Sequence, residues 1–130
     1  MRNETVTVLL PAPRGDVFAY LANVENLPEW ANEFARELKV VDGRHKVVNG
    51  LGEFFFEVRA DPASGVIDML AGPSDDALWL FPTRVVGLPT GETAFTFTMF
   101  QPPGQTDVVF ESQYESLIRE LGNLEREFAR

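Results

Sequence analysis

The chain contains no cysteine and only one histidine, His45, among its 130 residues. Without cysteine it can form no disulfide, and it offers no thiol nucleophile, iron–sulfur ligand set or cysteine-type zinc site. A single histidine also excludes metal sites that pair two histidines on one helix. We therefore expect this protein to use no metal and no other cofactor.

Basic residues and long apolar runs are scarce as well. Eleven Lys and Arg stand against twenty Asp and Glu, which gives a formal net charge of -9. Such a chain repels phosphate backbones, so we expect no nucleic-acid partner. No apolar run approaches the roughly 18 residues that span a bilayer, and the N-terminus lacks the apolar segment of a secretory signal. These absences predict a cytoplasmic protein without a membrane span.

Aromatic residues, by contrast, are plentiful: the chain has 11 Phe, 2 Trp and 2 Tyr. Large rings are costly to leave in water, so they must line a core, a cavity or an interface. A chain of 130 residues is long enough to bury a core of its own and too short to divide, so we expect one domain over residues 1–130.

The order of local patterns indicates the fold class. A β-branched strand at 5–10 is followed by two short helices, of which the second carries Leu27, Trp30 and Phe34 on its apolar side. Turn signals at hairpin spacing then separate a series of strands and favour an antiparallel meander. The expected strands lie at 36–42, 44–49, 52–61, 65–71, 76–87 and 92–101.

A long amphipathic helix is predicted over 107–128, opened by Thr106 and Asp107. The residues expected on its apolar stripe are Phe110, Tyr114, Leu117, Ile118, Leu121, Leu124 and Phe128. The residues expected on its solvated side are Glu115, Arg119, Glu120, Asn123, Arg126 and Glu127. The whole order predicts an α+β fold, in which a curved antiparallel sheet of six to seven strands wraps around the long C-terminal helix. One helix cannot fill the concavity of so long a sheet, so we expect a pocket between them.

Several segments are similar to a known superfamily. The chain reads Val-Thr-Val at 6–8, Leu-Pro-Ala-Pro at 10–13, Asp-Val-Phe-Ala-Tyr-Leu at 16–21 and Asn-Val-Glu-Asn-Leu-Pro-Glu-Trp at 23–30. These segments resemble the start of START-like proteins, the SRPBCC superfamily, which includes polyketide cyclase/dehydrase-like, lipid-transfer and pollen-allergen-like members. The resemblance extends through 61–68, 81–86 and 97–104 and covers essentially the whole chain. It implies a helix-grip fold with an apolar cavity between the last helix and the sheet, and it assigns no catalytic residue.

Side-chain alternation along the strands, together with the helix stripe, predicts which residues face this cavity. Asp68 and Arg84 lie in mostly apolar strands and are included as polar groups that could hold one end of a ligand, the alternative being surface ion pairs. The predicted ligand-binding residues are Trp30, Phe34, Phe54, Phe56, Asp68, Trp79, Phe81, Arg84, Phe95, Phe97, Met99, Tyr114 and Leu117. Pro82 interrupts one of the strands and leaves its register open.

The sequence leaves three functions open. We favour binding of a small apolar or aromatic ligand, because the sequence contains no nucleophile motif and no paired carboxylates. The alternative is a cyclase or dehydratase acting on a polyketide-like or aromatic substrate in the same cavity, which would require Asp68, His45, Tyr114 or Arg84 to be buried there. The third is an interaction module that forms a homodimer through the outer sheet face around Phe55. We favour an isolated, exposed Phe55 ring over a dimer contact, and we expect His45 to be exposed as well.

Overall fold

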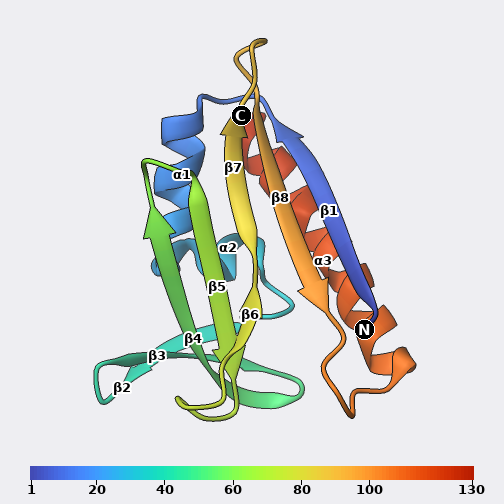
Figure 1. Cartoon of the computed structure of the whole chain (residues 1–130). Coiled ribbons are helices and arrows are strands. Elements are labelled where there is room, and N and C mark those ends of the chain that lie inside the picture. The colour runs from blue at the N-terminus through green and yellow to red at the C-terminus, as the bar shows by residue number, and fades with distance from the viewer.

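The computed structural model describes residues 1–130 (Figure 1). It contains eight strands in a single sheet. The helical elements are α1 (Arg14–Ala22), the 3-10 turn η1 (Val24–Asn26), α2 (Leu27–Trp30) and α3 (Asp107–Phe128). The strands are β1 (Asn3–Leu10), β2 (Glu37–Val41), β3 (Arg44–Asn49), β4 (Gly52–Asp61), β5 (Val66–Gly72), β6 (Trp79–Phe81), β7 (Thr83–Gly87) and β8 (Thr93–Phe100).

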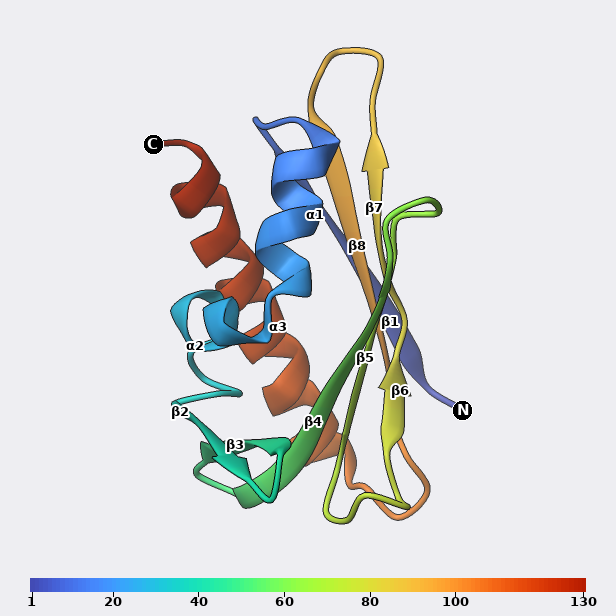
Figure 2. The same cartoon turned by 90° about the vertical axis from the view of Figure 1, so that its left-hand side faces the viewer.

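The sheet is antiparallel throughout, with the order β1-β8-β7-β5-β4-β3-β2 and with β6 paired to β5. All the helices lie on one side of it, and α3 runs along the inner face (Figure 2). The predicted helix-grip architecture, with its two short helices after the first strand, is therefore confirmed. No helix in the fold combines the length and the apolar composition that crossing a lipid bilayer requires.

The segment expected to form one strand over 76–87 forms two. β6 pairs only with β5, through Met69, Leu70 and Ala71, whereas β7 pairs along its length with β8 and also with β5, through Arg84 and Val66. Pro82 stands between them and has no N–H to donate to a sheet neighbour. Its carbonyl accepts from the Thr98 N–H at 2.9 Å, so pairing with β8 begins at this residue, while the chain stays beside β5 in the same register.

The core lies between the inner sheet face and the stripe of α3. Its largest fully buried side chains include Phe95 on β8, Phe110 and Leu124 on α3, and Ile67 on β5. Two assignments on α3 were wrong: Ile118 is 47% exposed, and Glu120 is only 4% exposed. Asn123, expected on the solvated side, donates from its amide to the Trp30 carbonyl at 2.9 Å.

Candidate functional site

A cavity of about 610 Å³ lies between α3, residues 27–36 and the inner face of the sheet. Thirteen of its 22 lining residues are hydrophobic. Leu51 in the β3–β4 turn and Val108 at the start of α3 both line it, and they are 67% and 79% exposed. The cavity therefore opens to solvent between this turn and the first turn of α3.

Aromatic rings from distant parts of the chain form much of the cavity wall. Phe34 meets Phe56 of β4 with ring centroids 5.8 Å apart, and Phe81 of β6 meets Phe97 of β8 at 5.9 Å. Trp30 of α2 lines the same space and packs edge-on against the buried Phe95. Edge-to-face and tilted contacts of this kind fix the orientation of each ring, so the wall is preformed.

Residues 30–36 form one side of the cavity and are attached to its other walls by polar contacts. The Asn123 amide binds the Trp30 carbonyl, and the Asn49 amide of β3 donates to the Phe34 carbonyl at 2.8 Å. Arg119 of α3 donates two hydrogen bonds to the Glu33 carboxylate, at 2.7 and 2.8 Å. These hydrogen bonds hold the pKa of Glu33 below its ordinary value, with a further contribution from Ser116.

The buried carboxyl of Glu120 also lies on the cavity wall. Its Oε2 accepts from the Glu33 N–H at 3.1 Å and from the Phe34 N–H at 3.0 Å. Burial raises the pKa of Glu120 to about 7, although these two hydrogen bonds act in the opposite direction. Near neutral pH the cavity thus contains a carboxyl group that can gain or lose a proton.

Seven of the predicted ligand-binding residues line the cavity. They come from α2 and the segment after it, from three strands and from α3. They are Trp30, Phe34, Phe56, Phe81, Phe97, Met99 and Leu117. The structure brings these side chains together, and their contact with a ligand stays a prediction.

Four more of the predicted apolar or aromatic residues lie on the inner side without lining the cavity. Phe95 is fully buried behind the wall, between Trp30 and Phe97. Phe54 and Tyr114 are partly buried and pack against the core. Trp79 is partly buried on β6, and its indole N–H has no acceptor.

The two predicted polar residues, Asp68 and Arg84, do not face the cavity. Asp68 alternates with the buried Ile67 and Met69, and Arg84 is exposed between the buried Thr83 and Val85. Successive strand residues point to opposite faces, so both side chains lie on the outer face. The prediction that these two side chains face the cavity is therefore corrected: both lie on the opposite face of the sheet.

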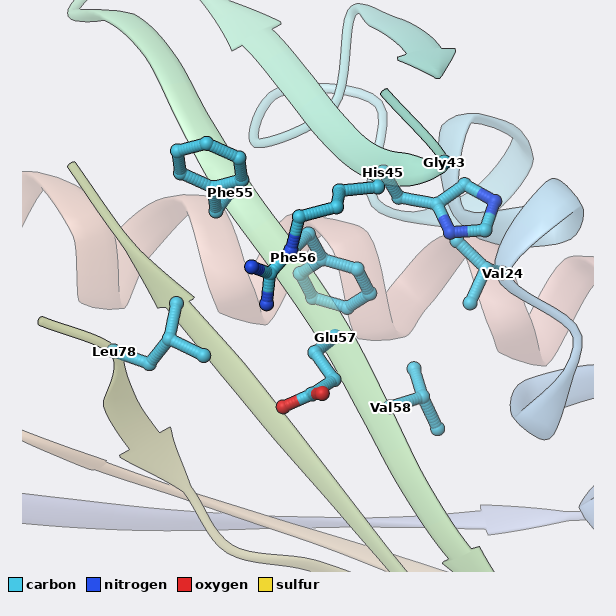
Figure 3. Close-up of a pocket in the computed structure, with 9 residues that line it drawn as sticks. Val24, Gly43, His45, Phe55, Phe56, Glu57, Val58 and Leu78 are labelled. Carbon is cyan, nitrogen blue, oxygen red and sulfur yellow. The ribbon is translucent and has the colours of Figure 1, made fainter. Parts of the chain in front are cut away.

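His45 lines a different and smaller hollow, of about 280 Å³, together with Val24 and Gly43 (Figure 3). The hollow forms where β3 diverges from β4, because the pairing of the two strands ends at Lys46 and Phe55. His45 is partly buried there and lies outside the main cavity. No three His, Cys, Asp or Glu side chains come together as a metal site would require.

The polar part of the cavity, above all Glu120, was not predicted from the sequence. A helical signal for it was present, because Glu120 follows the buried Leu117 by three positions and precedes the buried Leu124 by four. Its charge led us to place it on the solvated side. Glu33 and Arg36, in the segment after α2, were missed because no periodic pattern covers them.

The fold is that of START-like proteins, as comparison with solved structures confirms. The Zhui aromatase/cyclase from Streptomyces sp. R1128 superposes with a TM-score of 0.76 at 17% identity, covering 99% of this chain and 94% of that one. A START superfamily protein from Mycobacterium smegmatis gives 0.68 at 17% identity, with 98% and 97% covered. The Aha1 dimer from Colwellia psychrerythraea gives 0.71 at 15% identity, with 98% and 96% covered.

These identities support a shared fold and carry no ligand or activity over to this chain. No protein-family model and no curated protein matches the sequence.

Proposed function

We propose that this protein binds a small, mostly apolar ligand with a flat or aromatic body in the cavity under α3. The observation that carries the proposal is a cavity of about 610 Å³ with rings on several sides and an opening to solvent. Ligand sites in proteins usually measure roughly 300–1,000 Å³ and are lined mainly by apolar and aromatic groups. A space closed by Phe34, Phe56, Phe81 and Phe97 suits a planar molecule.

Two neighbouring residues of α3 provide a matched test. Leu117 is 5% exposed and lines the cavity, whereas Ile118 is 47% exposed and points away from it. Leu117→Trp places an indole in the cavity, and Ile118→Trp adds the same group to the outside of the helix. We expect Leu117→Trp to weaken binding of the uncharged dye Nile red by about tenfold or more, because it fills the binding volume.

The measurement is a fluorescence titration of both variants and the parent, with melting curves to verify that each is folded. Ile118→Trp should bind the dye as the parent does. Equal binding by Leu117→Trp and the parent, or no binding by the folded parent of Nile red or of any member of an aromatic metabolite set, would contradict the proposal.

A second candidate function is that of a cyclase or dehydratase, and the buried position of Glu120 on the cavity wall favours it. A carboxyl with a pKa of about 7 in an apolar cavity is suited to general acid or base chemistry. The four residues first considered for this role do not line the cavity. Incubation of the parent and Glu120→Gln with poly-β-keto thioester mimics tests the candidate: it requires a cyclised or dehydrated product from the parent and at least about a hundredfold slower formation by the variant.

A further inference from the structure

One polar atom on the cavity wall has no partner within the protein. Glu120 is 4% exposed, and its Oε2 accepts the two N–H groups of Glu33 and Phe34. No protein group donates to its other oxygen, Oε1. Glu120 lines the cavity and Oε1 is not one of the fully enclosed polar atoms, so this oxygen can be reached from the cavity and is available to a group brought in by a ligand.

We propose that Oε1 of Glu120 anchors the hydroxyl group of an otherwise apolar, uncharged ligand. This inference rests on the proposed function, and it adds the chemical group by which the cavity would recognise its ligand. Oε2 is held by two backbone N–H groups, so the carboxyl is fixed before the ligand arrives. A fixed acceptor among apolar side chains discriminates strongly between a donor and a group that cannot donate.

The charges around the cavity favour a neutral ligand. Arg36 and Arg119 both line it, and the Arg36 guanidinium lies beside Gly50 near the opening, so a cation would be repelled. An anion would meet the carboxylates of Glu33 and Glu120 on the same wall. A hydroxyl group satisfies Oε1 without introducing a second buried charge.

The charged groups facing Glu120 are Glu33 and Arg36 on the segment after α2, and Arg119 on α3 itself. The strands across the cavity present apolar groups there, among them Phe56 and Met99. Above pH 7 the carboxylate can only accept a hydrogen bond, whereas below pH 7 the acid can donate one. Preference for a hydroxyl over an ether should therefore appear at high pH and fade at low pH.

The test compares 2-naphthol with 2-methoxynaphthalene, which have the same ring system but differ in their ability to donate. Binding of each is measured by calorimetry at pH 8 and pH 5.5 to the parent, to Glu120→Gln and to Glu125→Gln. In Glu120→Gln the amide oxygen can still accept the two N–H groups, while its NH₂ turns the free position from an acceptor into a donor. Glu125→Gln removes the same charge from an exposed position on the same helix and serves as the control.

We expect the parent and Glu125→Gln to bind 2-naphthol about tenfold more tightly than the ether at pH 8, as for a hydrogen bond to a charged group. At pH 5.5 the two probes should bind the parent within about threefold of each other, because the protonated acid can donate to both. Glu120→Gln should show no preference for the hydroxyl at either pH.

Equal binding of the two probes to the parent at pH 8 would overturn this inference and leave the proposed function standing. The same holds for a preference that persists in Glu120→Gln. Binding of neither probe would overturn the anchor, and it would overturn the proposed function as well if the folded parent also fails to bind Nile red and the aromatic metabolite set. If Glu120→Gln does not fold, the change with pH in the preference of the parent for 2-naphthol over the ether decides by itself whether Glu120 is the anchor.

Discussion

Glu120 affects both the stability of the fold and the proposed recognition of a ligand. A carboxyl that is 4% exposed loses most of its hydration, and two backbone N–H groups replace part of it. The same two hydrogen bonds attach the segment after α2 to α3 and so hold that side of the cavity. The charged form remains less favourable than in water, which is why the pKa of this group is raised.

This raised pKa predicts how stability depends on pH. The pKa of Glu120 rises from an ordinary 4.5 to about 7, so between these values the folded chain binds more protons than the unfolded chain. The free energy of unfolding contributed by this group is therefore highest below pH 4.5 and falls as the pH rises to 7, by about 3 kcal/mol at about 1.4 kcal/mol per pKa unit. Urea unfolding at pH 4.5 and pH 8 measures the change, which Glu120→Gln should lack.

Glu125→Gln is the matched control and should follow the parent across the same range, since its side chain is exposed. Parallel stability curves for the parent and Glu120→Gln would show that the buried carboxyl does not titrate as its environment predicts.

At the scale of elements, residues close together in the sequence determine where α3 begins and which of its faces is buried. The Thr106 hydroxyl accepts from the Val109 N–H at 3.2 Å, and Asp107 lies in the first turn, where a negative charge interacts favourably with the helix dipole. The buried Phe110, Leu117 and Leu124 then follow at helical spacing. This helix carries Leu117, Arg119 and Glu120, which line the cavity. The residues that fix its first turn therefore also influence the geometry of the cavity.

Removing the cap should weaken the whole fold. We expect Thr106→Ala to lower the free energy of unfolding by about 1 kcal/mol, because the first turn of α3 loses an acceptor for one of its free N–H groups. Thr106→Ser keeps a hydroxyl at the same position and should stay near the parent value. Urea unfolding of the three proteins measures both effects, and equal losses in the two variants would show that the hydroxyl is not the stabilising group.

At the scale of the whole molecule, the outer face of the sheet determines whether the chain associates with itself. Phe55 lies there, and the Lys46 ammonium stands 4.5 Å from the centre of its ring, with the Arg44 guanidinium at 5.6 Å. These cations cover part of the ring that would otherwise be apolar and exposed. The net charge of -9 also opposes contact between two copies.

We therefore predict a monomer of 14.6 kDa in light scattering at micromolar concentration and moderate salt. Phe55→Lys should have the same mass as the parent. A parent of twice that mass that becomes monomeric on this substitution would establish the homodimer instead.

Local patterns were sufficient to predict most elements of the fold. The helix over 107–128 and the strands over 44–49 and 52–61 have the predicted bounds, because side-chain periodicity, a cap and turn residues are all short-range signals. The division at Pro82 was only partly foreseen. A proline marks an interruption, but only the tertiary structure shows that the chain stays beside β5 on both sides of it and gains β8 as a second neighbour after it.

The sequence by itself determined that apolar and aromatic side chains would gather between a long helix and a curved sheet, since alternation along the strands and the stripe on the helix follow from backbone geometry. The tertiary structure decided which of them border an open space and which, like Phe95, lie behind its wall. It also placed Glu120 among them, because the burial of a charged residue depends on whether distant backbone groups, here the N–H groups of Glu33 and Phe34, are there to bind it.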